Sequence, residues 1–258
     1  MASPNSSPVA IVTGCASGIG LATAQVFLQE GYRVFGVDVS DLDFSKLGGQ
    51  DANMGFKKAN LTAEGMCEEV VKECIEKFGA RIDVLANVAG VSDAFAAADT
   101  FTDVEFTRVM AINLTVPLHL MRAVLPVMKE QKSGAIINVA SKSALSGAAA
   151  GVAYTASKHG LLGATKHTAW RFKDAGIRCN AVLPGGVATN IANSMQQQYF
   201  DMEAYTTLQP VHNLNTPQGK PLLVTPEHVA NAIFFLASEK AKFISGAALP
   251  VDTAWSTI

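Results

Sequence analysis

Short apolar runs alternate along the chain with longer stretches in which apolar positions recur every three or four residues. The short runs are almost continuously apolar, which is typical of parallel strands covered on both faces. The longer stretches have the spacing of amphipathic helices. Predicted strands cover residues 9–13, 33–38, 82–88, 135–140 and 177–183, with weaker candidates at 55–59 and 247–252. Predicted helices cover residues 19–30, 63–78, 103–129, 151–174 and 226–238.

This alternation predicts an α/β fold, a single Rossmann-type doubly wound parallel sheet of about seven strands with helices on both faces. No linker or repeat divides the chain, so we expect residues 1–258 to form one domain. Residues 189–223 are the exception, because they are rich in Gln, Asn, Met, Tyr and Pro and look irregular. Long irregular inserts in compact domains are usually functional, so we expect a substrate-binding lid here. A surface loop without a role is the alternative.

Composition excludes several classes of partner. The chain is 49% hydrophobic and 16% charged, with a net charge of −2, so no basic surplus indicates nucleic acid or an anionic membrane. The N-terminal residues show no signal sequence, and no uninterrupted apolar run approaches about 18 residues, so we expect a cytoplasmic protein without a membrane span. The cysteines lack metal-ligand spacing, and we predict no metal site and reduced thiols. They are Cys15, Cys67, Cys74 and Cys179.

A glycine-rich turn, TGCASGIG at residues 13–20, lies between the first predicted strand and the first predicted helix. Gly14 would permit the tight turn, Gly18 the close approach of a ligand, and Gly20 the close packing of helix on strand. The N–H groups at the helix start would then face a pyrophosphate. We therefore predict a dinucleotide-binding turn. Its contact residues would be Gly14, Ser17, Gly18, Ile19 and Gly20.

Asp38 ends the second predicted strand, 18 residues after Gly20. At this place an acidic side chain holds the ribose hydroxyls of NAD, and it would repel the 2′-phosphate of NADP. No Lys or Arg lies in the glycine turn or in residues 39–41 to attract that phosphate. We therefore predict that the cofactor is NAD. A turn former at a strand end is the alternative reading of Asp38.

Tyr154 and Lys158 are four residues apart in a predicted helix made mostly of small residues. Positions i and i+4 share one helix face. A nearby ammonium group lowers the pKa of a phenol from its usual value of about 10, which would suit Tyr154 to exchange a proton with a substrate hydroxyl. An ordinary surface pair is the alternative.

Together, these motifs make the chain resemble the short-chain dehydrogenase/reductase family along nearly its whole length. Ser141 lies 13 residues before Tyr154, and Asn113 lies 28 residues before Ser141, which are spacings similar to those of the family. The order of all the motifs makes the resemblance specific. The matching pieces are TGCASGIG (13–20), NVAG (87–90), AINLT (111–115), INVAS (137–141), YTASK (154–158) and PGGVAT (184–189).

The resemblance implies an NAD(P)-dependent oxidoreductase with a catalytic tetrad of Asn113, Ser141, Tyr154 and Lys158. Ser141 would position the substrate oxygen, Lys158 would bridge the ribose hydroxyls, and Asn113 would hold a water that connects Lys158 to solvent. For Asn87 a purely structural role is equally open. The further cofactor contacts implied are Asn60, Leu61, Asn87, Ala89, Gly90, Tyr154, Lys158, Pro184, Gly185, Val187 and Thr189.

Two departures from the family pattern bear on the expected structure. Asn60 replaces a frequent Asp at the adenine contact. Asp252-Thr253-Ala254 stands where the family usually has Asp-Gly-Gly near the C-terminus. The resemblance also implies a homotetramer or homodimer, with the helices at 103–129 and 151–174 at an interface.

We therefore predict an NAD-dependent oxidoreductase that transfers a hydride between the nicotinamide and a secondary alcohol or ketone, with Tyr154 as general acid/base. The substrate would be a small, fairly apolar molecule beneath the lid. Two alternatives remain: a non-catalytic NAD-binding regulatory protein, and a reductase of a C=N or C=C bond on the same scaffold. The residues expected to line the substrate pocket are Met195, Tyr199, Met202 and Tyr205.

Overall fold

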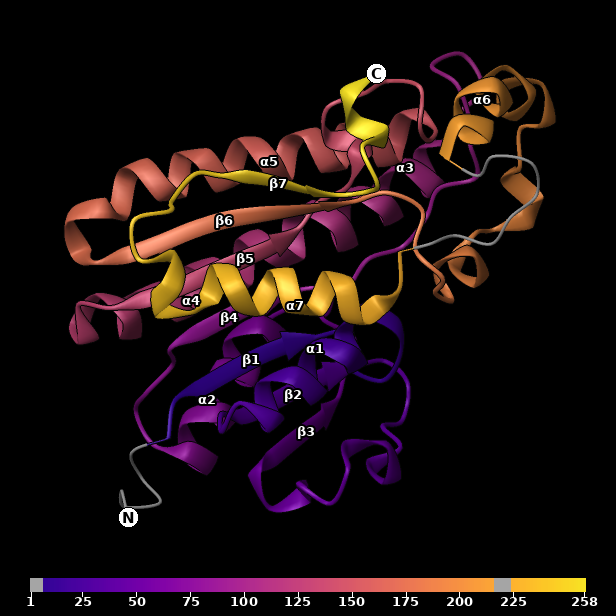
Figure 1. The fold of residues 1–258 in the computed structure, drawn as a ribbon. Helices are drawn as coiled ribbons and strands as arrows, with labels where there is room; N and C mark the ends of the chain where they lie inside the picture. The colour runs from indigo at the N-terminus through magenta and orange to yellow at the C-terminus, as the bar shows by residue number, and fades with distance from the viewer. Residues whose placement is uncertain (1–6, 216–223) are drawn as a thin grey trace.

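The computed structural model describes residues 7–215 and 224–258. Its strands are β1 (Val9–Thr13), β2 (Arg33–Asp38), β3 (Met54–Lys58), β4 (Val84–Asn87), β5 (Gly134–Val139), β6 (Ile177–Pro184) and β7 (Ala248–Val251). They form one parallel sheet in the order β3-β2-β1-β4-β5-β6-β7, which confirms the predicted Rossmann-type fold (Figure 1). The order of the strands reverses between β1 and β4. In doubly wound sheets a ligand crevice lies at this point, outside the carboxyl ends of the strands.

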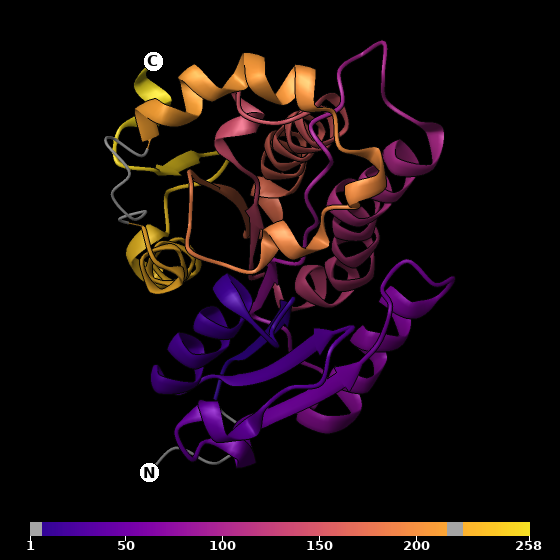
Figure 2. The same ribbon diagram turned by 90° about the vertical axis from the view of Figure 1, so that its right-hand side faces the viewer.

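Helices cover both faces of this sheet. They are α1 (Gly18–Gln29), α2 (Met66–Phe78), α3 (Asp103–Met110), α4 (Val116–Gln131), α5 (Val152–Phe172), α6 (Met202–Asn215) and α7 (Pro226–Ala237). Figure 2 shows α1 and α7 on one side of the sheet and α2 and α4 on the other. A hydrophobic core lies on each face of the sheet, and β1 contributes to both. Ala10 and Val12 pack in the core under α1 and α7, and Val9 and Ile11 pack in the core under α2 and α4. Burial on both faces explains why the strands are apolar at nearly every position.

The predicted helix at residues 103–129 is interrupted where the structure forms a π turn, η4 (Ala111–Thr115), between α3 and α4. Single π turns inside helices often mark functional sites. A second boundary also differs from the prediction, because α2 begins at Met66 rather than at residue 63. Gly65 precedes it in the left-handed conformation, with φ 73°, and this starts the helix.

The predicted irregular segment contains a helix that sequence analysis missed. α6 occupies 14 residues, and the Asp201 side chain accepts a hydrogen bond from Ala204 N (2.9 Å) at its start. The helix was concealed by its Gln- and Asn-rich surroundings and by Pro210 in its interior. Residues 189–215, referred to below as the lid segment, are described. Residues 216–223, the rest of the predicted lid, lie outside the described residues.

The long helical segment Asp103–Gln131 has 29 residues and a mean hydropathy of 1.4, so by length and composition alone it could cross a membrane. Core helices of globular proteins can have the same length and hydropathy. Its inward side, including Leu120 and Val124, packs in the core that α2 also covers. Only 39% of its apolar stretch is buried, so much of its apolar surface faces outward in the single chain.

The C-terminal turn keeps its shape without the glycines common in the family. β7 forms, and Thr253 and Ala254 follow it with φ angles of 51° and 70°. A left-handed conformation costs a residue with a side chain about 1–2 kcal/mol. The turn is therefore formed at the expense of backbone strain.

We expect Ala254→Gly to raise the free energy of unfolding by about 0.5–1 kcal/mol. Relief of the left-handed strain exceeds the extra conformational entropy that glycine adds to the unfolded chain, about 0.4–1 kcal/mol. Urea denaturation followed by circular dichroism measures the change. Ala156→Gly, at an exposed position of α5, is the control and should destabilise by about 0.5–1 kcal/mol. Destabilisation by Ala254→Gly would contradict the strain argument.

Candidate active site and dinucleotide cleft

A cleft of about 310 Å³ opens where β1, β2 and β4 end. Its position at the reversal of strand order is the one expected for a ligand crevice in this class of sheet. Many of the predicted cofactor contacts line it together. These are Gly14, Ser17, Gly18, Ile19, Gly20, Asp38, Asn60, Leu61, Ala89, Gly90 and Thr189.

The glycine turn fits an anionic group by its backbone alone. Gly14 has φ 70°, and a Cβ at Gly20 would overlap the carbonyl oxygen of Gly14, so both positions require glycine. Ser17 is the N-cap of α1 but makes no side-chain capping hydrogen bond, and the first turn carries no acidic residue. The positive end of the helix is therefore available to a phosphate. This observation fits the binding of a dinucleotide.

Asp38 is held at the mouth of the same cleft. Its carboxylate accepts hydrogen bonds from Ala16 N (3.0 Å) and Ser40 N (2.9 Å), which tie the end of β2 to the glycine turn. One cation lies closer than the sequence suggested, since the sheet register pairs Lys58 with Asp38. The ammonium of Lys58 binds Asp41 (2.8 Å). Sequence analysis missed this cation because Lys58 lies 20 residues after Asp38 along the chain.

Asn60 lines the cleft, and its Oδ1 already accepts hydrogen bonds from Thr62 N (3.0 Å) and Thr62 Oγ1 (2.9 Å). Next to it, sequence reasoning missed a set of mostly apolar wall residues, which come from several elements and of which only Val88 and Ile112 lie within a quoted motif. They are Val37, Val39, Ala59, Thr62, Val88, Val91, Ile112, Val116, Asn190, Ile191 and Ser194.

Six predicted cofactor contacts do not line this cleft: Asn87, Tyr154, Lys158, Pro184, Gly185 and Val187. Asn87 is buried and its Nδ2 donates to Asn138 Oδ1 (2.8 Å), while its own Oδ1 has no hydrogen-bond partner among the described residues. A Cβ at Gly185 would come within 2.7 Å of Asp252 Cβ, which shows that this glycine makes room for the C-terminal turn. Val187 forms a parallel bridge with Val224.

Cys15, inside the glycine turn, is a buried packing residue. Burial raises the pKa of its thiol to about 12, so it is not an activated nucleophile. Within the described ranges, no three His, Cys, Asp or Glu side chains are arranged to hold a metal ion.

Tyr154 and Lys158 lie together, with Lys158 Nζ 5.4 Å from the centre of the tyrosine ring. The predicted lowering of the tyrosine pKa is wrong for the protein by itself. Burial raises the pKa of Tyr154 to about 12, and the hydrogen bond with Ser141 opposes this only in part. Burial also lowers the pKa of Lys158 to about 8, while its ammonium donates to Val139 O (2.9 Å). The cost of desolvating both charged forms therefore outweighs their attraction.

Ser141 follows β5 directly and begins the short turn η5 (Lys142–Ala144). Its Oγ accepts a hydrogen bond from Ser143 N (3.0 Å), which holds the hydroxyl at the start of this turn. Ser141 and Tyr154 come from different elements, yet they share a hydrogen bond. The structure thus brings together the hydroxyl groups that the resemblance implied.

Asn113 lies in the π turn and is fully buried. Its side-chain amide forms two hydrogen bonds with the main chain of Val91: Oδ1 accepts from Val91 N and Nδ2 donates to Val91 O, both at 2.9 Å. It also donates to Ser157 Oγ (3.3 Å). In the described structure the amide of Asn113 fixes the loop after β4.

Gly90 joins the cleft to the tetrad. A Cβ there would lie 3.3 Å from Asn113 Oδ1 and 3.6 Å from Lys158 Nζ. Thr13 supports this junction, because its Oγ1 accepts from Val88 N (2.9 Å) and Ala89 N (3.0 Å). A dinucleotide in the cleft would therefore reach the side chains of the tetrad past Gly90.

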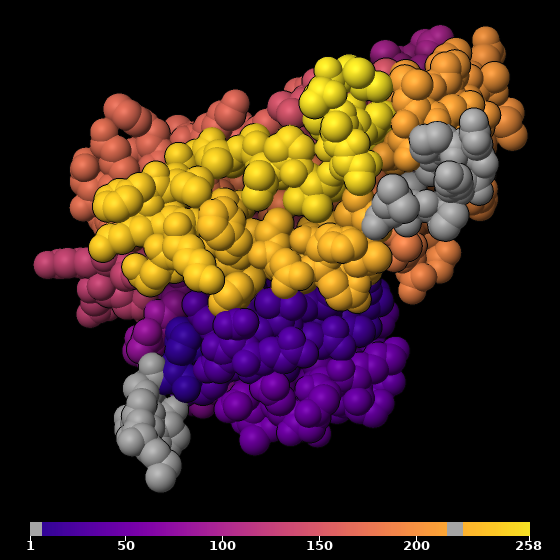
Figure 3. Space-filling model, viewed as in Figure 1, coloured from indigo at the N-terminus to yellow at the C-terminus, as the bar shows by residue number. Residues whose placement is uncertain are grey.

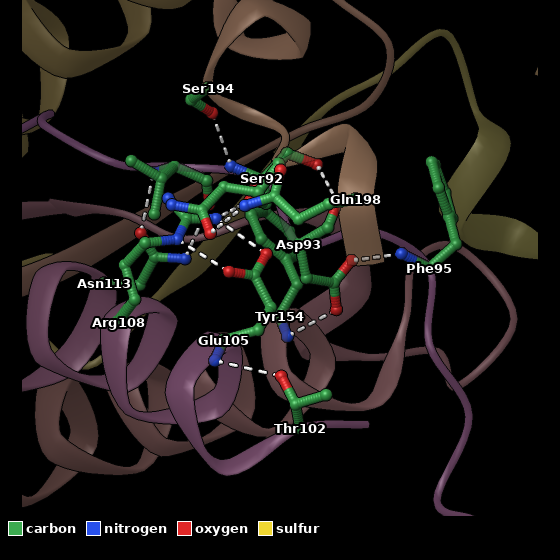
Figure 4. Close-up of polar contacts among 12 residues, drawn as sticks. Ser92, Asp93, Phe95, Thr102, Glu105, Arg108, Asn113, Tyr154, Ser194 and Gln198 are labelled. Atoms are coloured by element: carbon green, nitrogen blue, oxygen red, sulfur yellow. Dashed lines mark hydrogen bonds and ion pairs between the residues drawn. The ribbon is translucent and has the colours of Figure 1, made fainter. Parts of the chain in front are cut away.

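Asp93 is a buried acid at this site that sequence reasoning missed. Its carboxylate accepts hydrogen bonds from the backbone N–H of Tyr154 and Phe95 (Figure 4), and also from that of Gly151. Asp93 lies 61 residues before Tyr154, and no local motif signals that the two meet.

The lid segment contacts the same loop. Ser92 N donates to Ser194 Oγ (2.8 Å), and the ring of Phe95 packs against Tyr205, with ring centres 4.8 Å apart. Phe200 and His212 complete an aromatic cluster around Phe95. Of the predicted pocket residues, Tyr205 belongs to this cluster. Met202 does not, because it is 65% exposed at the start of α6.

The C-terminal residues fasten the lid segment from the other side, and Figure 3 shows their surface next to it. Trp255 Nε1 donates to Val211 O (3.1 Å) in α6. The buried ammonium of Lys142, beside Ser141, donates to the carbonyl of Trp255 and lies 4.9 Å from its ring centre. The lid segment is thus connected to the loop that carries Ser141.

Comparison with known proteins finds similarity along almost the entire chain. A family model described as enoyl-(acyl carrier protein) reductase matches residues 14–255. The short-chain dehydrogenase/reductase cdmF of Talaromyces verruculosus is 52% identical over 251 residues, which are 97% of this chain and 97% of that protein.

Two solved structures illustrate the similarity in fold. The 3-ketoacyl-(acyl-carrier-protein) reductase from Brucella melitensis, complexed with NADH, is 28% identical, with a TM-score of 0.82 over 96% of this chain and 98% of that one. ElxO with NADP bound is 29% identical, with a TM-score of 0.83 over 98% of this chain and 100% of that one.

Proposed function

Since the chain belongs to the short-chain dehydrogenase/reductase family, we propose that it is an NAD-dependent oxidoreductase acting on a secondary alcohol or ketone. The observation that carries this proposal is the Tyr154 hydroxyl, which is hydrogen-bonded to Ser141 and lies beside Lys158. Lys158 Nζ would lie 3.6 Å from a Cβ at Gly90, a residue that lines the candidate cofactor cleft. When bound, the nicotinamide supplies or accepts the hydride.

Tyr154 would move the proton of the reaction. A hydroxyl with a pKa of about 12 keeps its proton at neutral pH and can donate it to a carbonyl oxygen. Ser141 would hold the same oxygen and stabilise the charge that develops on it. Lys158, with a pKa of about 8, is mostly charged at pH 7 and would stabilise the tyrosinate that remains. In the opposite direction, tyrosinate would accept the alcohol proton.

The substrate would lie between Tyr154 and the lid segment. Support comes from the ring cluster of Phe95, Phe200 and Tyr205, which gathers next to the helix that carries Tyr154. An aromatic wall with few charges suits a fairly apolar small molecule. The exposed Gln and Asn side chains would then face solvent.

A reductase of a C=C or C=N bond is the second candidate, and the description of the matching family model as an enoyl reductase favours the C=C case. Purified protein should be assayed with secondary alcohols, ketones, enones and cyclic imines, with each nicotinamide cofactor, by its absorbance and by product analysis. Turnover of alcohols and ketones supports the first proposal. Turnover confined to enones or imines supports the second, and tight NAD binding without any turnover supports a regulatory protein.

We expect Asp38→Ala to shift cofactor preference from NAD toward NADP by about 10- to 100-fold in the ratio of kcat/KM values. The carboxylate would bind the ribose hydroxyls of NAD, and a hydrogen bond to a charged group contributes about 1.5–3 kcal/mol. The same charge would repel the 2′-phosphate of NADP. Steady-state kinetics with both cofactors measure the ratio. Asp51→Asn, an exposed charge change, is the control, and an unchanged ratio in Asp38→Ala would contradict NAD selection by Asp38.

We also propose a homodimer or homotetramer formed through α4 and α5. The outward apolar positions of the 103–131 helical segment support this, since Val104 is 65% exposed and Leu118 is 40% exposed in the single chain. Analytical ultracentrifugation tests the proposal, and a monomer at micromolar concentration would contradict it.

A further inference from the structure

We propose that Asp93 is a positioning residue for Tyr154: its carboxylate fixes the first turn of α5, and its negative charge acts on the Tyr154 hydroxyl. The proposal rests on the proposed function of Tyr154 as acid/base. It assigns a role to a buried acid outside the tetrad and outside the cofactor cleft.

The first turn of α5 is capped by groups from outside the helix. The N-cap residue, Gly151, has no side chain to satisfy the free N–H groups of the first turn. The loop after β4 does so instead. Asp93 Oδ2 accepts from Tyr154 N (2.9 Å), and the Ala96 carbonyl accepts from Val152 N (2.9 Å). A cap supplied from another segment fixes both the start and the orientation of the helix.

The loop that carries Asp93 packs tightly against the start of α5. Asp93 is only 2% exposed, and its Oδ1 accepts from Phe95 N (Figure 4) and from Gly151 N, both at 3.2 Å. A Cβ on Gly151 would lie 2.6 Å from Asp93 Oδ2 and 2.7 Å from the Phe95 carbonyl carbon. Phe95 itself adopts φ 61°. The loop after β4 and the start of α5 are therefore packed too closely to move independently, and a shift of the loop would displace the helix.

The contact between Asp93 and α5 acts on the position of Tyr154. Tyr154 is the residue whose own N–H is bound by Asp93, so the carboxylate holds the backbone from which the hydroxyl projects. Proton and hydride transfer depend on placing the reacting groups accurately, and an error of about 1 Å can cost about 100-fold in rate. Loss of the cap should therefore reduce kcat more than it reduces cofactor binding.

The charge of Asp93 also acts on Tyr154. A negative carboxylate disfavours the tyrosinate form, and the charge of Asp93 raises the pKa of Tyr154 in addition to burial. In the described part of the chain, Asp93 forms no salt bridge, so no cation screens it directly.

The other charged and titratable groups around Tyr154 differ from Asp93. Glu105 on α3 is paired with Arg108 (2.7 Å), and Arg108 also donates to Ser92 O (2.8 Å). Lys158 lies on the same helix as Tyr154. His212 and Tyr205 belong to the lid segment, and His212 lies against Ala149 O (3.1 Å).

The test compares Asp93→Asn, Asp93→Ala and Asp99→Asn with the unchanged protein. Asp99 lies on the same loop but is exposed, so Asp99→Asn is the matched control for loss of one charge. For each protein we would measure NAD affinity, thermal unfolding, and the pH profile of kcat for alcohol oxidation. The ultraviolet titration of tyrosinate, with Tyr154→Phe as the blank, measures the ionisation of Tyr154 without turnover.

Asp93→Asn removes the charge and keeps one acceptor oxygen. We expect kcat about tenfold lower, unchanged NAD affinity, and a Tyr154 titration and pH profile shifted down by about half to one pH unit. Asp93→Ala loses every acceptor, and its kcat should fall by roughly 100-fold. Asp99→Asn should match the unchanged protein.

An unshifted tyrosine titration in Asp93→Asn overturns the proposal even if kcat falls, because a structural cap alone would not move ionisation. Wild-type kcat in Asp93→Asn overturns it as well. If Asp93→Ala does not fold, Asp93→Asn still decides the question. Failure of the proposed function is distinguished separately, since it would appear as full activity of Tyr154→Phe.

Discussion

Tyr154→Phe is expected to reduce turnover by about 100- to 10,000-fold, the usual contribution of a positioned acid or base. The change removes one oxygen atom, which takes part in the hydrogen bond with Ser141 and is the only group of Tyr154 that can exchange a proton. The ring remains, so the packing beside Lys158 should persist. Single-turnover absorbance of the nicotinamide measures the chemical step, and fluorescence titration measures NAD affinity, which should change less than about threefold.

Tyr32→Phe is the matched control for this experiment. Tyr32 packs against Phe27 and Phe234 on the opposite side of the sheet, far from Ser141 in the fold. Its variant should retain full turnover. Full activity in Tyr154→Phe would contradict the assignment of the proton to this hydroxyl, whatever the substrate is.

Gly20→Ala is expected to weaken dinucleotide binding by at least about tenfold and to destabilise the protein by about 1–3 kcal/mol. The added Cβ would overlap the carbonyl oxygen of Gly14, so α1 must move away from the turn. The N–H groups at its start would then no longer converge on a phosphate. Isothermal titration calorimetry with NAD and urea denaturation measure the two effects.

Gly163→Ala gives the opposite expectation for the same chemical change. Gly163 is an exposed glycine within α5, and a Cβ there meets nothing within 4 Å. Alanine should stabilise the helix by about 0.5–1 kcal/mol and leave NAD affinity unchanged. If both variants bind NAD normally, the close packing of Gly20 on Gly14 is not what shapes the cleft.

The parts of the site that could be predicted are those built from neighbouring residues. The glycine turn lies within residues 13–20, and its strand-turn-helix context is visible in the sequence. Asp38 could be predicted because it is the last residue of a recognisable strand, and the structure places it among the residues that line the cleft. The spacing of Tyr154 and Lys158 sets their common helix face for geometric reasons alone.

The parts that were missed depend on segments that are distant along the chain. Lys58 reaches Asp38 only through the pairing of β2 with β3. Asp93 meets Tyr154 only because the loop after β4 caps α5. The helix α6 was missed because its composition favours irregular structure. In the folded protein it is stabilised by the packing of its Tyr205 on Phe95 and by the hydrogen bond from Trp255 to the carbonyl of its Val211.

The ionisation of Tyr154 and Lys158 best distinguishes what the sequence determines from what the tertiary structure determines. The sequence by itself determined the alternation of strands and helices, the glycine turn and the common helix face of Tyr154 and Lys158, because hydrophobic period, turn residues and i to i+4 spacing act locally. Only the tertiary structure decided the pKa values, raising that of Tyr154 and lowering that of Lys158. Proton affinity in a folded protein depends on desolvation, and how much water a group loses is set by every segment that packs around it.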